Sequence, residues 1–410
     1  MPTRSPTGRE VRTLATGHSL LVRVAGGRVV TGYSGPVSRR VVQVSTVHRT
    51  RDNRIYNKEC RALVEAGLDV TLLIRAEADE QSPVPVRALP TPASRLTRLT
   101  TMQFRAWREL GRLRPDLVHV HDPELIPMAL LWARTHRAAV VYDAHEDLVK
   151  QVDTKPYLGS WRRGLARGYG RFLLWLANSF MDGIVAATPD IAAGFTGERV
   201  AVVHNYPWLS DFAAERDPVP GRLVYTGDLT EERRLSFMRD VVAVVRRSVP
   251  EAHLVLAGVV GPAVSEEARS FDGDLVRHLG LLPPSQIPEV LATAELGLIF
   301  LAPLPNYVNS LPTKLFEYQA AGLPAVASDF PHWRDIFGGD GATVFVDSGD
   351  VAATASRIVE LLGDRAELER LSVAGRAAVR GRFNFESQAE ALVGLVERAA
   401  STTDRSRVGR

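Results

Sequence analysis

Short runs of apolar, often β-branched residues alternate with helix-period segments along most of this 410-residue chain. Such alternation predicts parallel β-α-β units, in which helices cover both faces of a doubly wound sheet. The runs form two series, which predicts two α/β domains of similar construction. The first series comprises 41–45, 69–74, 116–121, 138–145, 183–188 and 200–205, and the second comprises 222–227, 253–258, 275–280, 296–301, 324–329 and 342–347.

The pattern also predicts how the chain is divided. A polar, proline-containing stretch separates the two series and is typical of a linker. Because ligands bind at the carboxyl ends of strands in open α/β sheets, two such domains facing each other would share one deep cleft. The expected segments are a poorly ordered extension (1–39), a first Rossmann-like domain (40–205), a linker (206–221), a second Rossmann-like domain (222–382), a C-terminal helix (383–400) and a solvated tail (401–410).

Composition narrows the class of protein. Charged residues make up 24% and hydrophobic residues 45%, which is ordinary for a soluble globular chain. A formal charge of +3 permits anionic ligands or a membrane surface and requires neither. The single cysteine, Cys60, excludes internal disulfides and fits a reducing compartment such as the cytoplasm. The longest apolar stretch, 171–180, is too short to span a bilayer.

Polar residues gather where the predicted strands end. One strand-end histidine is more often structural than functional, but several together at one sheet edge favour a ligand site. The mixture suits a dianionic ligand rich in hydroxyl groups, because cations bind phosphates while carboxylates and amides bind sugar hydroxyls. These residues are Asp52 and Arg54 after the first strand, His121 and Asp122 after the third, His145 and Glu146 after the fourth, and Asp228 and Arg233 after the seventh.

The loop and helix at 306–322 carry the strongest local pattern. Asn309, Ser310 and Leu311 precede a helix N-terminus, where free amides and the helix dipole attract anions. Lys314 and Glu317 stand at i and i+3 and share one helix face. This pair is either an ordinary surface ion pair or a phosphate and hydroxyl ligand pair.

Several motifs, in this order, resemble those of retaining family-4 glycosyltransferases of the GT-B fold. They are HVHDPELIP, VVYDAHED, VAATPDIA, VVHNYP and LPTKLFEYQAAGLPAVASDF. The resemblance covers residues 41–395 and is greatest to bacterial members that build surface polysaccharides. It implies that the C-terminal domain binds a nucleotide diphospho-sugar and that the N-terminal domain binds the acceptor.

The resemblance also implies roles for residues of the donor side. Glu317 matches the glutamate that holds the donor ribose, whereas Asn309 stands where the family has a second glutamate. Arg233 matches a cation on the diphosphate, with Lys314 as a further cation. Asp228 stands where the family has a second arginine, so fewer cations would be available to neutralise the diphosphate. Amides near Ser310 and Leu311 would assist the leaving diphosphate.

On the acceptor side, the resemblance places His121 near the transferred sugar as a catalytic residue. Asp52, Arg54, Asp122, His145 and Glu146 are expected to contact the acceptor. The expected acceptor is a polysaccharide or lipid-linked saccharide, and a natural-product aglycone remains open. The nucleotide-sugar is the only co-substrate expected, with no metal, other cofactor or nucleic acid.

Other interpretations stay open. Because Asn309 and Asp228 depart from the family pattern, an inactive, donor-binding subunit of a glycosylation complex is one alternative. A nucleotide-sugar epimerase or hydrolase is a second alternative. The run Asp272-Gly273-Asp274 resembles a metal-binding pattern but lies away from the expected donor motif, so we discount it. The basic segment 158–180 could contact an anionic membrane or form a domain helix with solvated arginines, and we favour the second.

Overall fold

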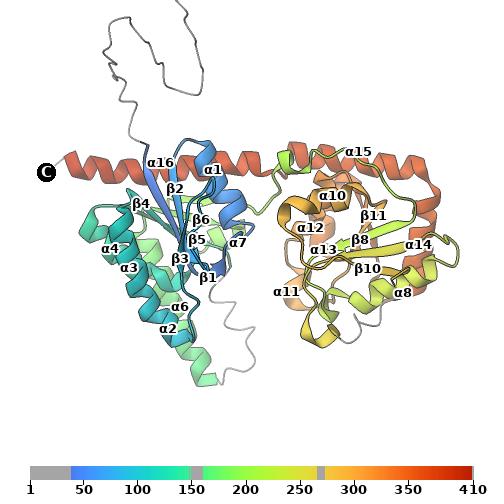
Figure 1. The fold of residues 1–410 in the computed structure, drawn as a ribbon, viewed down its shortest axis with the longest axis horizontal. Coiled ribbons are helices and arrows are strands. Elements are labelled where there is room, and N and C mark those ends of the chain that lie inside the picture. Colours follow the sequence, from blue (N-terminus) through green and yellow to red (C-terminus); the bar gives the residue numbers. More distant parts are fainter. Residues whose placement is uncertain (1–37, 147, 149–159, 266–272, 409–410) are drawn as a thin grey trace, which may run out of the picture.

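The computed structural model describes residues 38–146, 148, 160–265 and 273–408. Two α/β domains lie side by side, and the last two helices pass over them, α15 (Arg365–Gly381) over the C-terminal domain and α16 (Phe385–Val408) over the N-terminal domain (Figure 1). The expected extension at 1–39 lies outside the described residues apart from its last two positions. Asp272 of the discounted motif also lies outside them.

The N-terminal domain contains a seven-stranded parallel sheet in the order β3-β2-β1-β4-β5-β6-β7. Six of its strands coincide with the runs expected from the sequence. The remaining strand, β3, was missed because only four residues between prolines form it. The strands are β1 (Arg40–Arg49), β2 (Asp69–Arg75), β3 (Val86–Leu89), β4 (Leu117–Val120), β5 (Ala139–Ala144), β6 (Gly183–Ala186) and β7 (Val200–Val202).

The C-terminal domain contains a six-stranded parallel sheet in the order β10-β9-β8-β11-β12-β13. This order repeats that of the first sheet. In each sheet the order of strands switches direction between the first and fourth strands of the domain, which are β1 and β4 in the first sheet and β8 and β11 in the second. Ligand crevices form at such points in open sheets. The strands are β8 (Arg222–Thr226), β9 (His253–Ala257), β10 (Val276–His278), β11 (Leu296–Ile299), β12 (Ala325–Ser328) and β13 (Thr343–Val346).

Helices cover both faces of each sheet (Figure 1). Those of the first domain are η1 (Ile55–Cys60), α1 (Arg61–Glu65), α2 (Arg95–Leu99), α3 (Thr101–Leu113), η2 (Pro123–Leu125), α4 (Ile126–His136), α6 (Ser160–Phe180) and α7 (Pro189–Ala192). Those that follow are η3 (Leu209–Phe212), η4 (Glu231–Arg233), α8 (Leu235–Val245), η5 (Pro262–Val264), η6 (Pro284–Gln286), α10 (Ile287–Ala292), α11 (Pro305–Val308), α12 (Thr313–Ala320), α13 (Pro331–Phe337), η7 (Gly338–Asp340), α14 (Val351–Gly363), α15 (Arg365–Gly381) and α16 (Phe385–Val408).

The last helix, α16, returns to the first domain and completes its core. Phe385, Leu392 and Leu395 are buried among side chains of β2, η1 and α1. Burying each such side chain contributes roughly 1.5–3 kcal/mol. The helix continues to Val408, so the chain at 401–408 is helical rather than the tail expected from its composition.

Each sheet is packed on both faces by apolar clusters. In the first domain, one cluster lies between the sheet and α16, and another contains Trp132 and Leu110 under α3 and α4. In the second, Trp333 and Phe316 pack on one face, and Met238 and Val241 of α8 pack on the other. None of the helices in the described parts of the chain combines the length and apolar character needed to cross a bilayer.

Candidate functional site

A cavity of about 760 Å³ lies between the two domains. One wall is formed by residues 51–65 of the loop after β1, η1 and α1. The other is formed by the carboxyl ends of β8 and β9, by the segment 281–288, and by Lys314 and Glu317 of α12. The cavity therefore lies where the open-sheet rule predicts a ligand, and its volume fits a drug-sized or nucleotide-sized molecule.

Two glycines at the carboxyl ends of β8 and β9 bring backbone up to this cavity. Gly227 and Gly258 have φ values of 144° and 154°. A Cβ at Gly258 would lie 1.7 Å from the Gly227 carbonyl oxygen, so no side chain fits there. Backbone rather than side chains therefore lines this part of the cavity.

Lys314 and Glu317 project from one face of α12, as their i and i+3 spacing predicts, and this face lines the cavity. The Lys314 Nζ donates to Glu317 Oε2 at 3.0 Å. Both side chains line the cavity, so this pair does not lie on an unrelated surface. An ammonium and a carboxylate side by side can serve a phosphate and a sugar hydroxyl.

The loop before α12 differs from its expected form. The Ser310 amide donates to the Tyr307 carbonyl at 3.0 Å, and the Trp333 indole donates to the Ser310 carbonyl at 2.9 Å. The Ser310 amide is therefore not free to bind an anion, because the preceding turn uses it. Asn309 is exposed and Leu311 half-buried, and neither is among the residues that line the cavity.

Arg233 and Asp228 follow β8 on the same edge of the second sheet. The Arg233 guanidinium is half-buried and donates from Nη1 to the Tyr225 hydroxyl at 3.4 Å. Asp228 is exposed and lines the cavity, whereas Arg233 does not. Contact between Arg233 and a ligand in this cavity therefore requires the side chain to swing from Tyr225.

The edge of the first sheet holds a buried ionic network centred on Asp143, the fifth residue of β5. Arg54 binds its carboxylate through two hydrogen bonds of 2.8 and 2.9 Å and donates a third, of 2.8 Å, to the Val203 carbonyl. Arg54 is 6% exposed. Its guanidinium is thus used inside the protein, contrary to the expected contact with an acceptor.

Two histidines complete this network. His121 Nδ1 lies 3.2 Å from His145 Nε2, and the same His145 nitrogen lies 2.7 Å from Asp143 Oδ2. The other ring nitrogen of His121 contacts the Gln43 side-chain oxygen. Burial lowers the pKa of His121. Both nitrogens of His121 therefore have protein partners, and His145 is the more exposed of the two.

Burial acts to raise the pKa of the Asp143 carboxyl, but Arg54 and His145 hold it well below its ordinary value. Asp143 was not singled out from the sequence, although it lies inside the motif VVYDAHED. A buried charged residue in an otherwise apolar strand was the signal that could have found it.

Asp122 and Asp52 hold the end of β1 and the loop after it. The buried Asp122 carboxylate accepts hydrogen bonds from the hydroxyl groups of Ser45 and Thr46 and from the Val47 amide at 3.1 Å, all within β1. Asp52 accepts from the amides of Arg54 and Ile55, each at 3.0 Å, and pairs with His48 Nδ1 at 2.9 Å. Burial acts to raise the pKa of Asp52, but these hydrogen bonds lower it to about 2. Glu146 is exposed beside this network.

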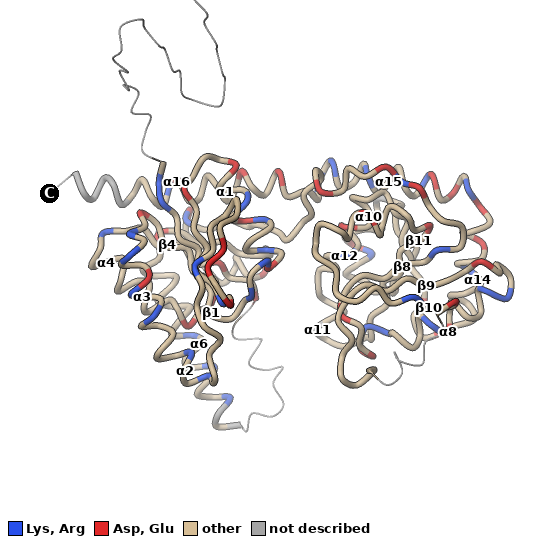
Figure 2. The backbone as a smooth tube through the Cα atoms, in the orientation of Figure 1, with Lys and Arg blue, Asp and Glu red and all other residues tan. Residues whose placement is uncertain are grey.

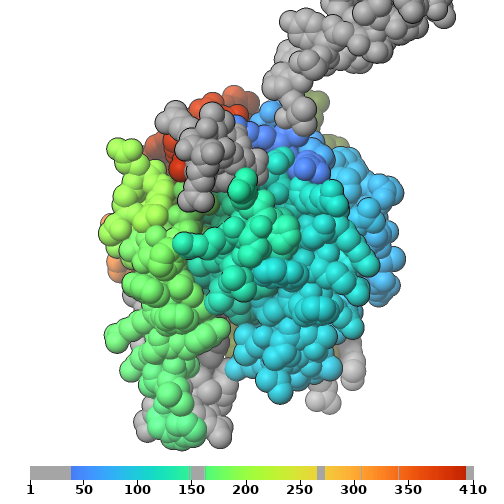
Figure 3. All heavy atoms as spheres, turned by 90° about the vertical axis from the view of Figure 1, so that its left-hand side faces the viewer, coloured from blue at the N-terminus to red at the C-terminus, as the bar shows by residue number. Residues whose placement is uncertain are grey.

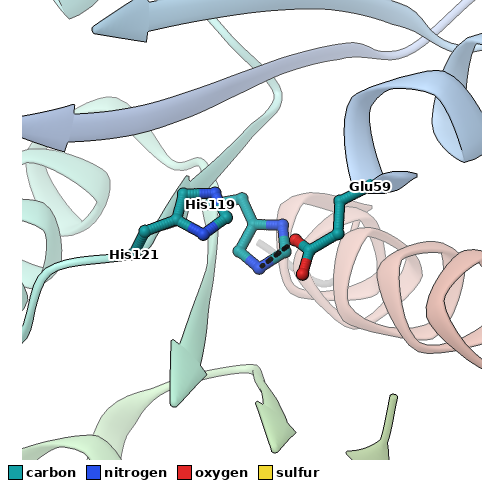
Figure 4. Close-up of side chains that lie close together, drawn as sticks. All are labelled: Glu59, His119 and His121. Carbon is teal, nitrogen blue, oxygen red and sulfur yellow. Dashed lines mark ion pairs between the residues drawn. The ribbon is translucent and has the colours of Figure 1, made fainter. Parts of the chain in front are cut away.

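Two overlapping trios have metal-like spacing, Glu59–His119–His121 and His121–Asp143–His145. Figure 4 shows the Glu59 carboxylate directed at the His119 ring, 3.9 Å from its Nε2. Arg54 Nε also lies 3.0 Å from Glu59 Oε1, so the Arg54 guanidinium already forms ion pairs with the carboxylates of both Glu59 and Asp143. Burial and the nearby Asp143 charge raise the pKa of Glu59 well above its ordinary value, which favours a neutral acid there. A fixed guanidinium and a neutral acid fit a metal ion poorly.

Comparisons with known proteins agree with this architecture. A model described as "Glycosyl transferase 4-like domain" matches residues 54–206, and one described as "Glycosyl transferases group 1" matches residues 220–364. A phosphatidyl-myo-inositol mannosyltransferase of Mycobacterium leprae is 27% identical over 384 residues, 91% of this chain and 96% of that protein. An amylovoran biosynthesis glycosyltransferase of Erwinia amylovora is 24% identical over 185 residues, 44% of this chain and 46% of that protein.

Solved structures share the fold at low sequence identity. Sucrose-phosphate synthase of Thermosynechococcus elongatus has a TM-score of 0.63 at 17% identity, covering 89% of this chain and 100% of that chain. HepE of Anabaena, solved in complex with UDP-glucose, has a TM-score of 0.63 at 13% identity, covering 88% of this chain and 99% of that chain.

Two parallel sheets of this strand order with a cavity between them define the GT-B fold. Within that class, the chain belongs to the retaining family-4, or group 1, glycosyltransferases, which transfer a sugar from a nucleotide-sugar donor. The fold and family expected from the sequence motifs are confirmed.

Proposed function

We propose that the interdomain cavity binds the nucleotide part of the donor and that the edge of the first sheet receives the acceptor. Glu317 would hold the ribose hydroxyls, and Lys314 and Arg233 would bind the diphosphate. The observation that carries this assignment is the Lys314–Glu317 pair, which faces a cavity lined by glycine backbone.

The proposed reaction follows from the charges on each side. The bond between the anomeric carbon and the phosphate oxygen breaks, which leaves negative charge on the diphosphate near Lys314 and Arg233. The acceptor oxygen attacks the same face of the sugar, and its proton passes to the departing phosphate oxygen. His145 and Glu146, the more exposed residues beside Asp143, would orient the acceptor hydroxyl.

A thermal-shift screen tests the donor site. Purified protein is heated with millimolar UDP, GDP, ADP or TDP, with and without EDTA. Ligand at a hundred times its Kd should stabilise the fold by about 2.7 kcal/mol. We expect stabilisation by one diphosphate that EDTA does not change, and then transfer of labelled sugar from the corresponding donor. Stabilisation by none of them would contradict the donor site, and turnover of donor without an acceptor would favour the epimerase or hydrolase alternative.

The surface of the first domain suggests where the acceptor is presented. Helix α6 extends to the lower end of this domain (Figures 1 and 3). Trp161, Leu165, Phe172 and Trp175 recur at helical spacing on one face and are 48–66% exposed. Figure 2 shows basic positions along the same helix, and its sequence includes Arg167 and Arg171. The exposed surface is therefore not limited to solvated arginines, which was the interpretation favoured from the sequence.

Exposed aromatic side chains beside arginines suit the interface of an anionic bilayer. We therefore propose a lipid-linked saccharide, or a polysaccharide assembled at the membrane, as the acceptor. A membrane-bound acceptor would bring α6 and the edge of the first sheet to the same surface.

Vesicle flotation tests the membrane contact. Wild-type protein is expected to float with vesicles that contain 30% phosphatidylglycerol. The double variant Trp161→Ser/Trp175→Ser is expected to lose this binding. The control Val373→Ser removes an apolar side chain, 58% exposed, from α15 of the other domain and is expected to keep it. Equal flotation of wild type and double variant would contradict the assignment of α6.

A further inference from the structure

Lys58 is a buried lysine in the wall of the interdomain cavity. It belongs to η1, a six-residue π-helix, and is 4% exposed. Its ammonium donates to the backbone carbonyl of Asn205 at 2.9 Å and to the side-chain oxygen of the same residue at 2.6 Å. In the described parts of the chain, no carboxylate forms an ion pair with it. Short π-helices are rare and occur frequently at functional sites.

The surroundings of Lys58 hold it at the base of the cleft. Asn205 directly precedes the first connection between the domains, where the Trp208 indole donates to the Asn57 carbonyl at 3.0 Å. The second connection passes beside it, because the Phe385 amide donates to the Pro207 carbonyl at 2.8 Å. The Lys58 ammonium lies 5.9 Å from the centre of the Phe385 ring. Its position is therefore fixed where both chain crossings meet.

Burial lowers the pKa of Lys58 to about 7. The charged groups that act on it come from the adjoining elements: Glu317 and Asp211 raise the pKa, whereas Arg54 and Lys314 lower it. Two neutral oxygens from one asparagine do not compensate fully for burying an ammonium. A polyanion in the cavity would supply the missing countercharge.

We propose that Lys58 is a donor-binding residue supplied by the N-terminal domain, and that its ammonium pairs with the diphosphate of the nucleotide sugar. The inference rests on the proposed function, because it places the diphosphate in the same cavity as Lys314 and Glu317. With Lys58 on one wall and Lys314 on the other, the diphosphate would bridge the two domains and link donor binding to the closing of the cleft.

Isothermal titration calorimetry on the full chain tests this contact. Wild type and variants are titrated at pH 6 with UDP, GDP, ADP and TDP, and with the nucleoside that matches the diphosphate that binds. Lys58→Gln removes the charge but keeps a donor for Asn205, and Lys58→Met removes both. Lys58→Arg keeps the charge. Arg357→Met is the control, because Arg357 of α14 has a 43% exposed side chain that pairs with Glu360 and does not line the cavity.

We expect both neutral variants to bind the diphosphate about tenfold more weakly, as typically follows loss of a charged hydrogen bond. Their affinity for the nucleoside should change less than about twofold, because it carries no phosphate. Lys58→Arg and Arg357→Met should stay close to wild type. Melting temperatures identify any variant that fails to fold, and Lys58→Gln then provides the comparison.

Unchanged diphosphate affinity in Lys58→Gln and Lys58→Met would overturn the inference and leave the donor site intact. An equal loss of nucleoside and diphosphate affinity would also overturn it, because it would assign Lys58 to the hinge alone. If wild type bound no diphosphate at all, the donor site itself would be wrong, and this inference with it.

Discussion

The two sheets share one strand order, but their carboxyl edges hold charged residues in opposite ways. In the first sheet, Arg54 and Asp143 are buried and bind each other. In the second, Gly227 and Gly258 carry no side chain, and Lys314 with its partner glutamate faces a cavity.

This difference shows how one topology serves two tasks. Charges that neutralise each other internally fix the geometry of an edge before any ligand arrives. An edge made of backbone and a few half-exposed charges leaves room for a ligand that brings its own charge. Removing a charge should therefore mainly destabilise the first domain and mainly impair function in the second.

The largest expected effect is on the stability of the first domain. Arg54→Met should lower the free energy of unfolding by about 3–5 kcal/mol, because it leaves the Asp143 carboxylate buried without its cation. Urea unfolding at pH 7 measures this effect. The control Arg51→Met removes an exposed ion pair with Glu80, of 3.1 Å, and should cost at most about 1 kcal/mol. If Arg54→Met and Arg51→Met lowered the free energy of unfolding by similar amounts, the buried pair of Arg54 and Asp143 would be no more stabilising than an exposed ion pair, and the contrast between the two sheet edges would fail.

In the second domain, the corresponding effect should appear in turnover. Arg233→Ala is expected to reduce kcat by about 10²-fold or more, because a cation near the departing diphosphate is lost. Its free energy of unfolding should stay within about 1 kcal/mol of wild type. Kinetics with the donor found by nucleotide screening, together with urea unfolding, measure both quantities. Turnover within about threefold of wild type would show that Arg233 has no such role.

The pairing of Asp52 with His48 predicts a pH dependence. The pKa of Asp52 is lowered from 3.8 to about 2, so its contribution to stability is present above about pH 4 and disappears as the pH falls through about 2. Burial acts to lower the pKa of His48, but Asp52 raises it above 6.5 overall. The contribution of His48 is therefore complete below about pH 6.5 and lost as the pH rises through the raised value.

Asp52→Asn should accordingly cost about 1–2 kcal/mol of unfolding free energy at pH 5. The difference from wild type should shrink toward pH 2 and also above neutral pH. Urea unfolding at pH 5, 3 and 8 measures it. A difference independent of pH would mean that the asparagine acts through loop geometry rather than charge.

The smallest effect is expected for the ion pair that faces the cavity. Lys314→Met should change the free energy of unfolding by less than about 1 kcal/mol, because the Lys314 side chain is 29% exposed and water screens its pairing with the buried Glu317. Its affinity for the nucleotide diphosphate should nevertheless fall. Thermal unfolding and calorimetry measure the two properties in one variant. A large loss of stability would make this pair structural, like that of Arg54.

The two-sheet architecture could be predicted from the sequence, because strand and helix periods are local properties of the chain. The sequence also placed Lys314 and Glu317 on one helix face, since residues three apart on a helix are neighbours. It missed β3, which is too short to show a period. It also predicted a solvated tail at 401–410, whereas α16 continues to Val408.

Which polar residues line the cavity and which pair inside the protein could not be predicted from the sequence. Arg54 meets Asp143 from 89 positions away, and Lys58 meets Asn205 from 147 positions away. Charged residues that pair inside the protein and charged residues that line the cavity are of the same types and follow the strands in the same way along the sequence. The distinction depends on which strands become neighbours in the sheet and on where the chain crosses between domains, and no local pattern encodes either.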